Sequence, residues 1–272
     1  MNFENPPISI LNEKKLYIFD MDGTIYLGNK VFPFAIRFIK NLRKRGRRIL
    51  FFTNNASHSP AFYLEKLMRL GFEPTADEIM TSGDVTIEFL LRHRAGKGVY
   101  LVGTDDLVNN FRERGIDLLT GDEARADIVV TSFDTSLTYK KLDDACRLIR
   151  GGAEYLSTHP DFNCPTETGF IPDSGAIAAF VTASTGKVPT YFGKPYRETI
   201  DMICEATGCT KDEMCIFGDR LYTDIAIGKR HGVTAVLVLS GETQPADVET
   251  ADEADRPDFT FDSLDSIDRL MF

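Results

Sequence analysis

Two aspartates, Asp20 and Asp22, end a short apolar run and stand just before Gly23. Alternate residues of an extended chain share one face, so both carboxylates can point at one spot beyond the strand. Glycine lets the chain turn sharply there. Two close carboxylates repel each other unless a cation lies between them or one is protonated. The pair therefore predicts a site for a hard divalent cation, Mg²⁺, and the alternative is a loop with two solvated aspartates.

Two further junctions place polar residues directly after apolar segments. Thr53 and Asn54 follow one such run and offer hydroxyl, amide and backbone N–H donors, although by themselves they are better explained by a helix N-cap. Lys194 follows Gly193 before a helical pattern. A lysine at that place can neutralise carboxylates or a phosphate as a point charge, and the alternative is a solvated lysine.

A fourth junction places Asp219 after an apolar strand and a glycine, with Asp224 five residues later. Helix capping explains one such aspartate, but two of them indicate a cation site in which one carboxylate supports the ligands. The four junctions together supply acidic groups for a cation, one lysine, and hydroxyl and amide donors. That inventory suits an anionic, oxygen-rich group held on a metal, most simply a phosphoryl group.

Alternating strands and helices must position these junctions. Short apolar runs typical of strands buried on both faces are Leu16–Asp20, Ile49–Thr53, Val99–Val102, Ile128–Thr131, Met214–Phe217 and Ala235–Leu239. One last short strand is expected near Phe259–Phe261. Helical patterns lie between them, which predicts an α/β protein with crossover connections. Because open α/β sheets bind ligands beyond the carboxyl ends of their strands, each junction falls where a ligand is expected.

Composition sets the broad class of protein. The chain has 272 residues, 43% hydrophobic and 26% charged, which is typical of one or two ordinary globular domains. Its net charge of −10 argues against a nucleic-acid or anionic membrane partner, and no apolar run reaches 18 residues. The N-terminus shows no signal-peptide pattern, and the five cysteines include no C-x-x-C pair. We therefore expect a cytoplasmic protein.

The four motifs, in this order, resemble those of the haloacid dehalogenase (HAD) superfamily phosphatases. The likeness is to the class IIA branch, the NagD and p-nitrophenylphosphatase-like enzymes, and it covers nearly the whole chain. It implies a Rossmann-like, doubly wound parallel-sheet core with an inserted α/β cap domain. The interval of about 140 residues between the second and third motifs has room for such a cap. The expected core comprises residues 1–80 and 188–272, and the expected cap residues 81–187.

The resemblance also implies a role for each motif residue. Asp20 would be the nucleophile that forms an aspartyl-phosphate, and Asp22 the general acid and then base. Mg²⁺ would be held by the carboxylates of Asp20 and Asp219 and the backbone carbonyl of Asp22. Asp224 would orient waters bound to the metal. The phosphoryl oxygens would be held by Thr53, Asn54 and Lys194.

A segment of the expected cap, Thr158–Ile177, resembles the branch's cap loop. It departs from the family where His159 replaces a frequent asparagine and where Pro172–Gly175 replaces a Pro-Gly-x-Gly. The core binds the phosphoryl group, which all substrates share, so only contacts from the cap can distinguish one leaving group from another. His159, Asp161 and Asp173 are the predicted selectivity residues, and for each the alternative is a purely structural polar turn.

The expected activity is hydrolysis of a small phosphorylated metabolite, a sugar phosphate or similar compound. A phosphotransferase or mutase on the same fold is an alternative. A metal-dependent D-x-D glycosyltransferase is another, but it needs neither Lys194 nor Asp219 at these positions. A non-catalytic module on this fold would usually lack Asp20 or Asp22, and both are present. Monomer and homodimer both stay open.

Overall fold

The computed structural model describes residues 5–166 and 169–272, and the chain forms two compact units. The first unit comprises Met1–Thr53, Leu64–Met80 and Lys194–Phe272. The second comprises Asn54–Tyr63 and Thr81–Gly193. These units differ from the expected core and cap at residues 54–63 and 188–193, which group with the second unit. The exact domain boundaries stay a prediction.

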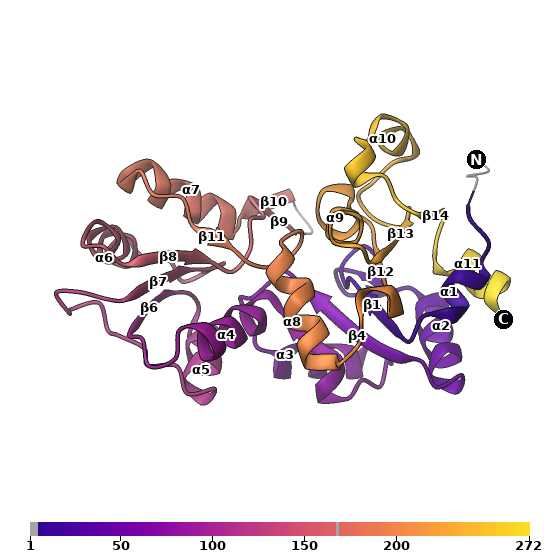
Figure 1. Ribbon diagram of the computed structural model, residues 1–272, viewed down its shortest axis with the longest axis horizontal. Coiled ribbons are helices and arrows are strands. Elements are labelled where there is room, and N and C mark those ends of the chain that lie inside the picture. The colour runs from indigo at the N-terminus through magenta and orange to yellow at the C-terminus, as the bar shows by residue number, and fades with distance from the viewer. Residues whose placement is uncertain (1–4, 167–168) are drawn as a thin grey trace. The chain divides into compact units, whose positions relative to one another are not determined.

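A six-stranded sheet forms the centre of the first unit, in the order β14-β13-β12-β1-β4-β5 (Figure 1). Its strands are β1 (Leu16–Phe19), β4 (Arg48–Thr53), β5 (Ile79–Thr81), β12 (Met214–Gly218), β13 (Thr234–Val238) and β14 (Phe259–Phe261). The pairs of β1 with β12 and with β4 are parallel. The chain first builds outward from β1 to β4 and later returns to its other side at β12. This reversal marks β1 as the switch point of a doubly wound sheet.

Aromatic packing fixes β1 in this sheet. All four of its residues are buried, as expected for a strand covered on both faces. The rings of Phe19 and Phe217 stack with centroids 4.8 Å apart, and Phe38 meets Phe19 edge to face. Helices flanking this unit are α1 (Ser9–Glu13), α2 (Pro33–Lys44), α3 (Pro60–Arg69, which begins in the second unit), α8 (Arg197–Thr207), α9 (Ala226–His231), α10 (Pro245–Thr250) and α11 (Leu264–Met271).

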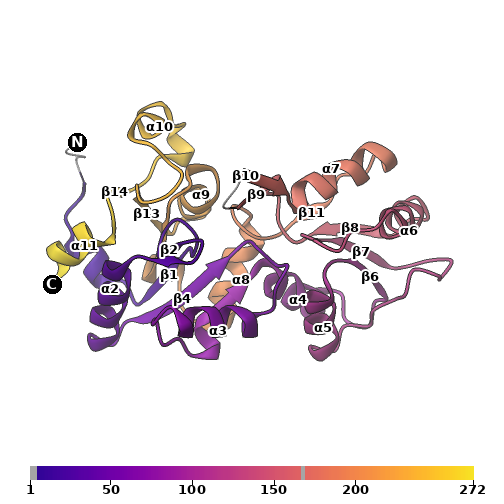
Figure 2. The ribbon, with the colours of Figure 1, turned by 180° about the vertical axis from the view of Figure 1, so that it is seen from behind.

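The second unit has its own parallel sheet, in the order β11-β8-β7-β6. Its strands are β6 (Val99–Val102), β7 (Ile128–Thr131), β8 (Glu154–Ser157) and β11 (Thr190–Tyr191). Figures 1 and 2 place α6 (Tyr139–Arg150) and α7 (Ser174–Thr185) on one face, and α4 (Ser82–His93) and α5 (Asp105–Glu113) on the other. An antiparallel hairpin, β9 (Asn163–Thr166) and β10 (Gly169–Pro172), precedes α7.

The seven strands predicted from the sequence all form, each within one residue at either end. The strands that the sequence did not predict are β5, β8, β11, and the hairpins β9–β10 and β2–β3 (Tyr26–Leu27 and Lys30–Val31). None of them is an apolar run of four residues: polar residues, glycine or proline interrupt β8, β9 and β10, and the others have only two or three residues.

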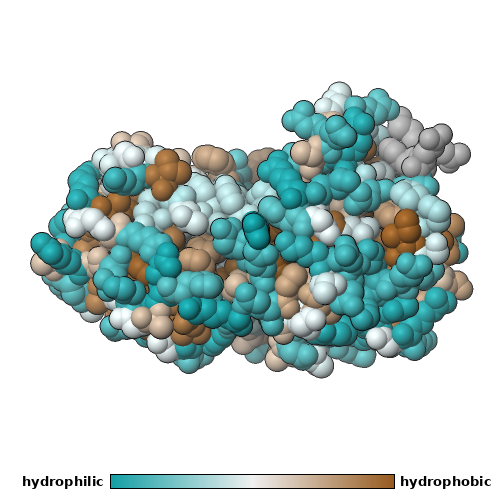
Figure 3. Space-filling view, in the orientation of Figure 1, coloured by the Kyte–Doolittle hydropathy of each residue, from teal (hydrophilic) through white to brown (hydrophobic). Residues whose placement is uncertain are grey.

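The surface agrees with the charged composition. On the face in Figure 3, hydrophobic residues form separate groups within a mostly hydrophilic surface. Among the described residues, no helix is both long enough and apolar enough to span a membrane.

Candidate active site

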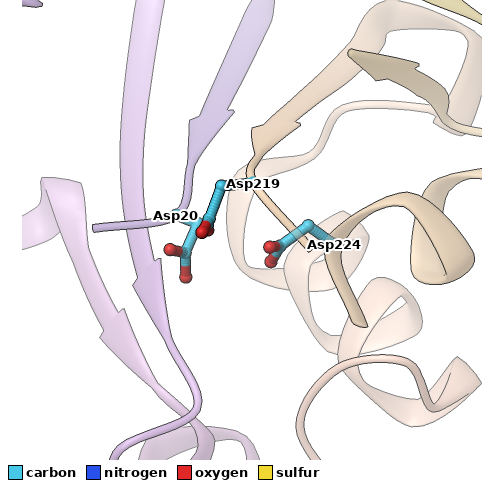
Figure 4. Close-up of side chains that lie close together, drawn as sticks. All are labelled: Asp20, Asp219 and Asp224. Atoms are coloured by element: carbon cyan, nitrogen blue, oxygen red, sulfur yellow. The ribbon is translucent and has the colours of Figure 1, made fainter. Parts of the chain in front are cut away.

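Three carboxylates converge at the carboxyl ends of β1 and β12 (Figure 4). Asp20 follows β1 directly, and its N–H donates to the carbonyl oxygen of Phe217 at 2.8 Å. Asp219 follows β12, and Asp224 lies on the π-helical turn η3 (Leu221–Ile225). One oxygen of each carboxylate lies within 4.8 Å of the others. The structure therefore gathers Asp20, Asp219 and Asp224 into one acidic cluster.

The backbone packs closely around Asp219. A Cβ on Gly23 would lie 2.3 Å from Asp219 Oδ2, and one on Gly241 would lie 2.0 Å from the same atom. The N–H of Glu242 donates to Oδ2 at 2.7 Å. Among the described residues, buried Oδ1 has no hydrogen-bond partner. A buried carboxylate oxygen without a donor, set among like charges, is what an oxygen-preferring cation such as Mg²⁺ would satisfy.

Lys194 supplies a positive charge inside the acidic cluster. Its Nζ donates to Asp20 Oδ1 and lies 2.6 Å from Asp224 Oδ1, while the residue is 2% exposed. Burial opposes the charge on this lysine, but the two carboxylates outweigh burial and raise the pKa of Lys194. The ammonium group therefore stays charged at neutral pH and partly neutralises the cluster.

The pKa values of the acids reflect the crowding of negative charge. Burial raises the pKa of Asp20 to about 7, while Lys194 opposes this rise and Asp224 adds to it. Burial, with the charges of Asp20 and Asp224, raises the pKa of Asp219 to about 8. Without a cation, the cluster thus retains protons that ordinary carboxyl groups lose near pH 4. Cation binding must displace those protons, which couples metal affinity to pH.

Asp22 lies close by in sequence but outside this cluster. Its Oδ1 accepts a long hydrogen bond of 3.5 Å from the N–H of Gly28. Burial raises the pKa of Asp22, and the charge of Lys66 and the Gly28 N–H oppose that rise. A raised pKa is the direction of shift that a general acid requires, because it favours the protonated carboxyl group.

Thr53 and Asn54 stand where the chain passes from the first unit to the second. Thr53 ends β4, the neighbour of β1, so it lies at the same edge of the sheet as Asp20. Asn54 is the first residue of the second unit and is 6% exposed. Its side-chain amide donates to Asp161 Oδ2 at 3.1 Å.

The three predicted selectivity residues differ in their surroundings. His159 and Asp173 are buried in the second unit and contact each other, with Nε2 2.8 Å from Oδ1. This arrangement favours the structural alternative for both. Asp161 is partly exposed and contacts Asn54, so it stays the strongest selectivity prediction. Glu167 and Thr168 of the predicted cap loop lie outside the described residues.

A second polar group beside the cluster was not predicted from the sequence. Arg220 Nε lies 2.9 Å from Glu242 Oε2, and the hydroxyl of Tyr222 donates to Glu242 Oε1 at 2.9 Å. Burial disfavours the charge on Arg220, but Asp20 and its neighbours raise the pKa of the guanidinium. The available signal was weaker than that of Asp219, because Glu242 lies four residues after the end of β13, whereas Asp219 directly follows β12.

Comparison with known proteins agrees with this geometry. A family model described as haloacid dehalogenase-like hydrolase matches residues 17–117, and a HAD hydrolase-like model matches residues 191–267. The 5′-nucleotidase YutF of Bacillus subtilis is 32% identical over 250 residues, which cover 92% of this chain and 96% of that protein. The chain belongs to the haloacid dehalogenase-like hydrolases. The predicted family is therefore confirmed.

Solved structures of this hydrolase family share the whole fold. The 4-nitrophenylphosphatase of Thermotoga maritima is 40% identical, with a TM-score of 0.90 over 96% of this chain and 98% of that one. A glycerol phosphate phosphatase of Mycobacterium tuberculosis, solved with magnesium, is 30% identical, with a TM-score of 0.88 over 95% of this chain and 77% of that one. The predicted fold class, and the prediction of an enzyme that hydrolyses phosphomonoesters, are confirmed.

Proposed function

We propose that this hydrolase is a Mg²⁺-dependent phosphatase of small phosphorylated metabolites that works through an aspartyl-phosphate on Asp20. The acidic cluster with Lys194 inside it is the observation that carries the proposal. Two buried carboxylates and the partly exposed carboxylate of Asp20 around one ammonium group leave excess negative charge, so the cluster suits a divalent cation and the phosphoryl group bound to it.

In the first step, an oxygen of Asp20 attacks phosphorus and the bond from phosphorus to the leaving oxygen breaks. The proton of Asp22 passes to that oxygen, so the product leaves as a neutral alcohol. Lys194 offsets the charge of Asp20, which lets an anionic nucleophile approach an anionic substrate. Thr53, Asn54 and Lys194 are the residues proposed to hold the phosphoryl oxygens.

In the second step, Asp22 has become a carboxylate and takes a proton from water. The water oxygen bonds to phosphorus, and the bond from phosphorus to Asp20 breaks. Inorganic phosphate forms and both aspartates return to their starting states. One residue thus serves as acid and then as base, which matches its raised pKa.

Asp20, Asp219 and the backbone carbonyl of Asp22 are proposed to hold Mg²⁺, with Asp224 beside them. When bound, the cation stabilises negative charge on the transferred phosphoryl group. Asp219 Oδ1, which has no other partner within the described chain, is the ligand atom that this proposal uses most directly.

The test is release of phosphate from p-nitrophenyl phosphate by the purified protein. We expect release with Mg²⁺, none after exhaustive chelation, and recovery when Mg²⁺ returns. Asp219→Ala should raise the Mg²⁺ concentration needed for half activity by about tenfold or more. Asp144→Ala is a matched control, because Asp144 is also buried but pairs with Lys140 in the second unit. Activity that survives chelation, or an unchanged Mg²⁺ requirement in Asp219→Ala, would contradict the metal assignment.

The substrate is proposed only as a class. Relatives are named for a nucleotide, a nitrophenyl ester and glycerol phosphate, which share a phosphomonoester and little else. A screen of phosphorylated metabolites, sugar phosphates among them, would rank the candidates by kcat/KM. The glycosyltransferase alternative requires transfer of a sugar and no phosphoryl-enzyme, so trapping phosphate on Asp20 would exclude it.

A further inference from the structure

His159 is a fully buried ionisable side chain of the second unit that the proposed mechanism does not use. It follows β8, is 0% exposed, and its Nε2 lies 2.8 Å from Asp173 Oδ1. Asp173 caps α7, where its Oδ1 also accepts the N–H of Ser174 at 2.6 Å. One side of the imidazole ring is thereby fixed to the start of a helix.

The other ring nitrogen of His159 faces two hydroxyl groups. Nδ1 lies 3.3 Å from Ser82 Oγ and 3.0 Å from Thr158 Oγ1. Each hydroxyl already donates its hydrogen, Ser82 to the main-chain oxygen of Asn54 at 2.5 Å and Thr158 to Ser132 Oγ at 2.9 Å. A hydroxyl group has one hydrogen, so both oxygens can only accept from the ring. Nδ1 therefore carries a hydrogen that it shares between Thr158, the nearer oxygen, and Ser82, and this contact helps to hold Ser82 in the orientation that binds Asn54.

Asn54 is held on several sides within the second unit. Ser82 binds its carbonyl oxygen, and Asp161 accepts from its side-chain amide. A Cβ on Gly193 would lie 2.7 Å from Asn54 Oδ1 and 3.0 Å from the Cβ of His159. Gly193 must therefore stay without a side chain, and its φ of 72° also favours glycine. The segments at Asn54, Ser82 and Gly193 all pack around His159.

These segments lie where the chain passes between the units, at residues 53–54, 80–81 and 193–194. Asn54 is a proposed phosphate ligand, and Lys194 directly follows Gly193. We infer that His159 is a positioning residue: by holding Ser82, it fixes the backbone and amide of Asn54 for phosphoryl binding. The inference rests on the proposed function for its last step only. It replaces the predicted contact between His159 and substrate with an effect exerted through Ser82.

Two substitutions separate the two sides of the ring. An asparagine amide at position 159 can take the place of Nδ1 and donate to Ser82, but it does not reach Asp173. A glutamine amide can take the place of Nε2 and reach Asp173, but it leaves Ser82 without its donor. If His159 acts through Ser82, His159→Asn should rescue function and His159→Gln should not. If the pair with Asp173 only stabilises the fold, this order should reverse.

The first measurement is the inhibition constant of inorganic phosphate against p-nitrophenyl phosphate, with Mg²⁺ saturating. We expect His159→Gln and Ser82→Ala each to raise this constant about tenfold, since a small misplacement of a binding group costs that much or more. Their double variant should be no worse than either single variant, because both changes break one chain of contacts. His159→Asn should stay within about threefold of the unchanged protein. Additive losses, or an unchanged constant in His159→Gln, would overturn the inference.

The second measurement does not depend on phosphatase activity. Hydrogen exchange of the backbone amides in residues 51–57 should quicken in His159→Gln and Ser82→Ala. Asp144→Asn, which disturbs a buried acid elsewhere in this unit, should lower the melting temperature without quickening exchange there. Unchanged exchange in both test variants overturns the positioning role. If the unchanged protein has no phosphatase activity but the backbone amides of the variants still exchange faster, only the proposed function is contradicted.

Discussion

Two polar clusters stand at comparable places in the two units, each beyond the carboxyl ends of a parallel sheet. Around Asp20, three carboxylates and one lysine leave Asp219 Oδ1 without a partner among the described residues. Around His159, hydroxyl groups, a carboxylate and a main-chain oxygen satisfy one another. Burial alone does not distinguish a reactive cluster from a supporting one. The difference lies in whether charge and hydrogen bonds are balanced within the protein.

Asp20→Asn should have the largest effect, and it tests whether the cluster around Asp20 is the reactive one. The amide cannot attack phosphorus, so kcat should fall by at least about a thousandfold while the fold is kept. Circular dichroism and thermal melting would confirm the fold. The matched change in the cluster around His159, Asp173→Asn, should affect the melting temperature more than turnover. Comparable turnover losses in the two variants would remove the distinction between the clusters.

Asp22→Asn tests acid catalysis separately from the charge balance of the acidic cluster, because Asp22 lies outside that cluster. With alkyl phosphates, whose leaving group needs a proton, the loss in kcat/KM should be about a hundredfold or more. With p-nitrophenyl phosphate the loss should be smaller, because p-nitrophenolate leaves without a proton. Measuring both substrates in both proteins decides the matter. An equal loss for both would indicate that Asp22 acts mainly in the second step.

Asp161→Ala tests the role of the partly exposed aspartate that contacts Asn54 in the second unit. If Asp161 touches leaving groups, kcat/KM should fall about tenfold for some larger substrates, and the order of preference should change. Acetyl phosphate, which has a very small leaving group, should be hardly affected. A uniform loss of kcat/KM across large and small substrates would instead show that Asp161 acts through Asn54, whose side-chain amide donates a hydrogen bond to it.

The smallest effect concerns the stability of the metal-free protein. Asp20 and Asp219 have pKa values of about 7 and about 8 in the fold, against about 4 when unfolded. The folded protein therefore binds more protons, so this contribution to stability is present below about pH 4 and lost as pH rises through about 7 to 8. The melting temperature should fall by several degrees over that upper range, and less in Asp219→Asn.

Added Mg²⁺ reverses this trend if the cluster is its site. The cation competes with protons for the carboxylates, so it should raise the melting temperature more at about pH 8.5 than at about pH 5.5. Asp219→Asn should lose most of this increase, and Asp144→Asn should keep it. Equal stabilisation by Mg²⁺ at both pH values would place the cation elsewhere.

Some of this protein could be predicted from the sequence because neighbouring residues determine it. Asp20 and Asp22 follow a buried strand, and Asp219 follows another. Parallel strands bring their carboxyl ends to one edge, so the acidic cluster was predictable once the strands were identified. The hairpin β9–β10 and strand β8 were not predictable, because polar residues, glycine or proline interrupt their apolar residues and these segments form through tertiary pairing rather than local pattern.

The roles of His159 and Asp173 depended on tertiary structure. Fourteen positions separate them in the chain, and both resemble substrate contacts when only the sequence is considered. Folding turns them toward each other and toward Ser82, 77 positions from His159. The sequence by itself determined which junctions carry reactive groups, because strand ends and glycines are local features. Only the tertiary structure decided which buried polar groups are balanced, because hydrogen-bond partners come from segments distant in the chain.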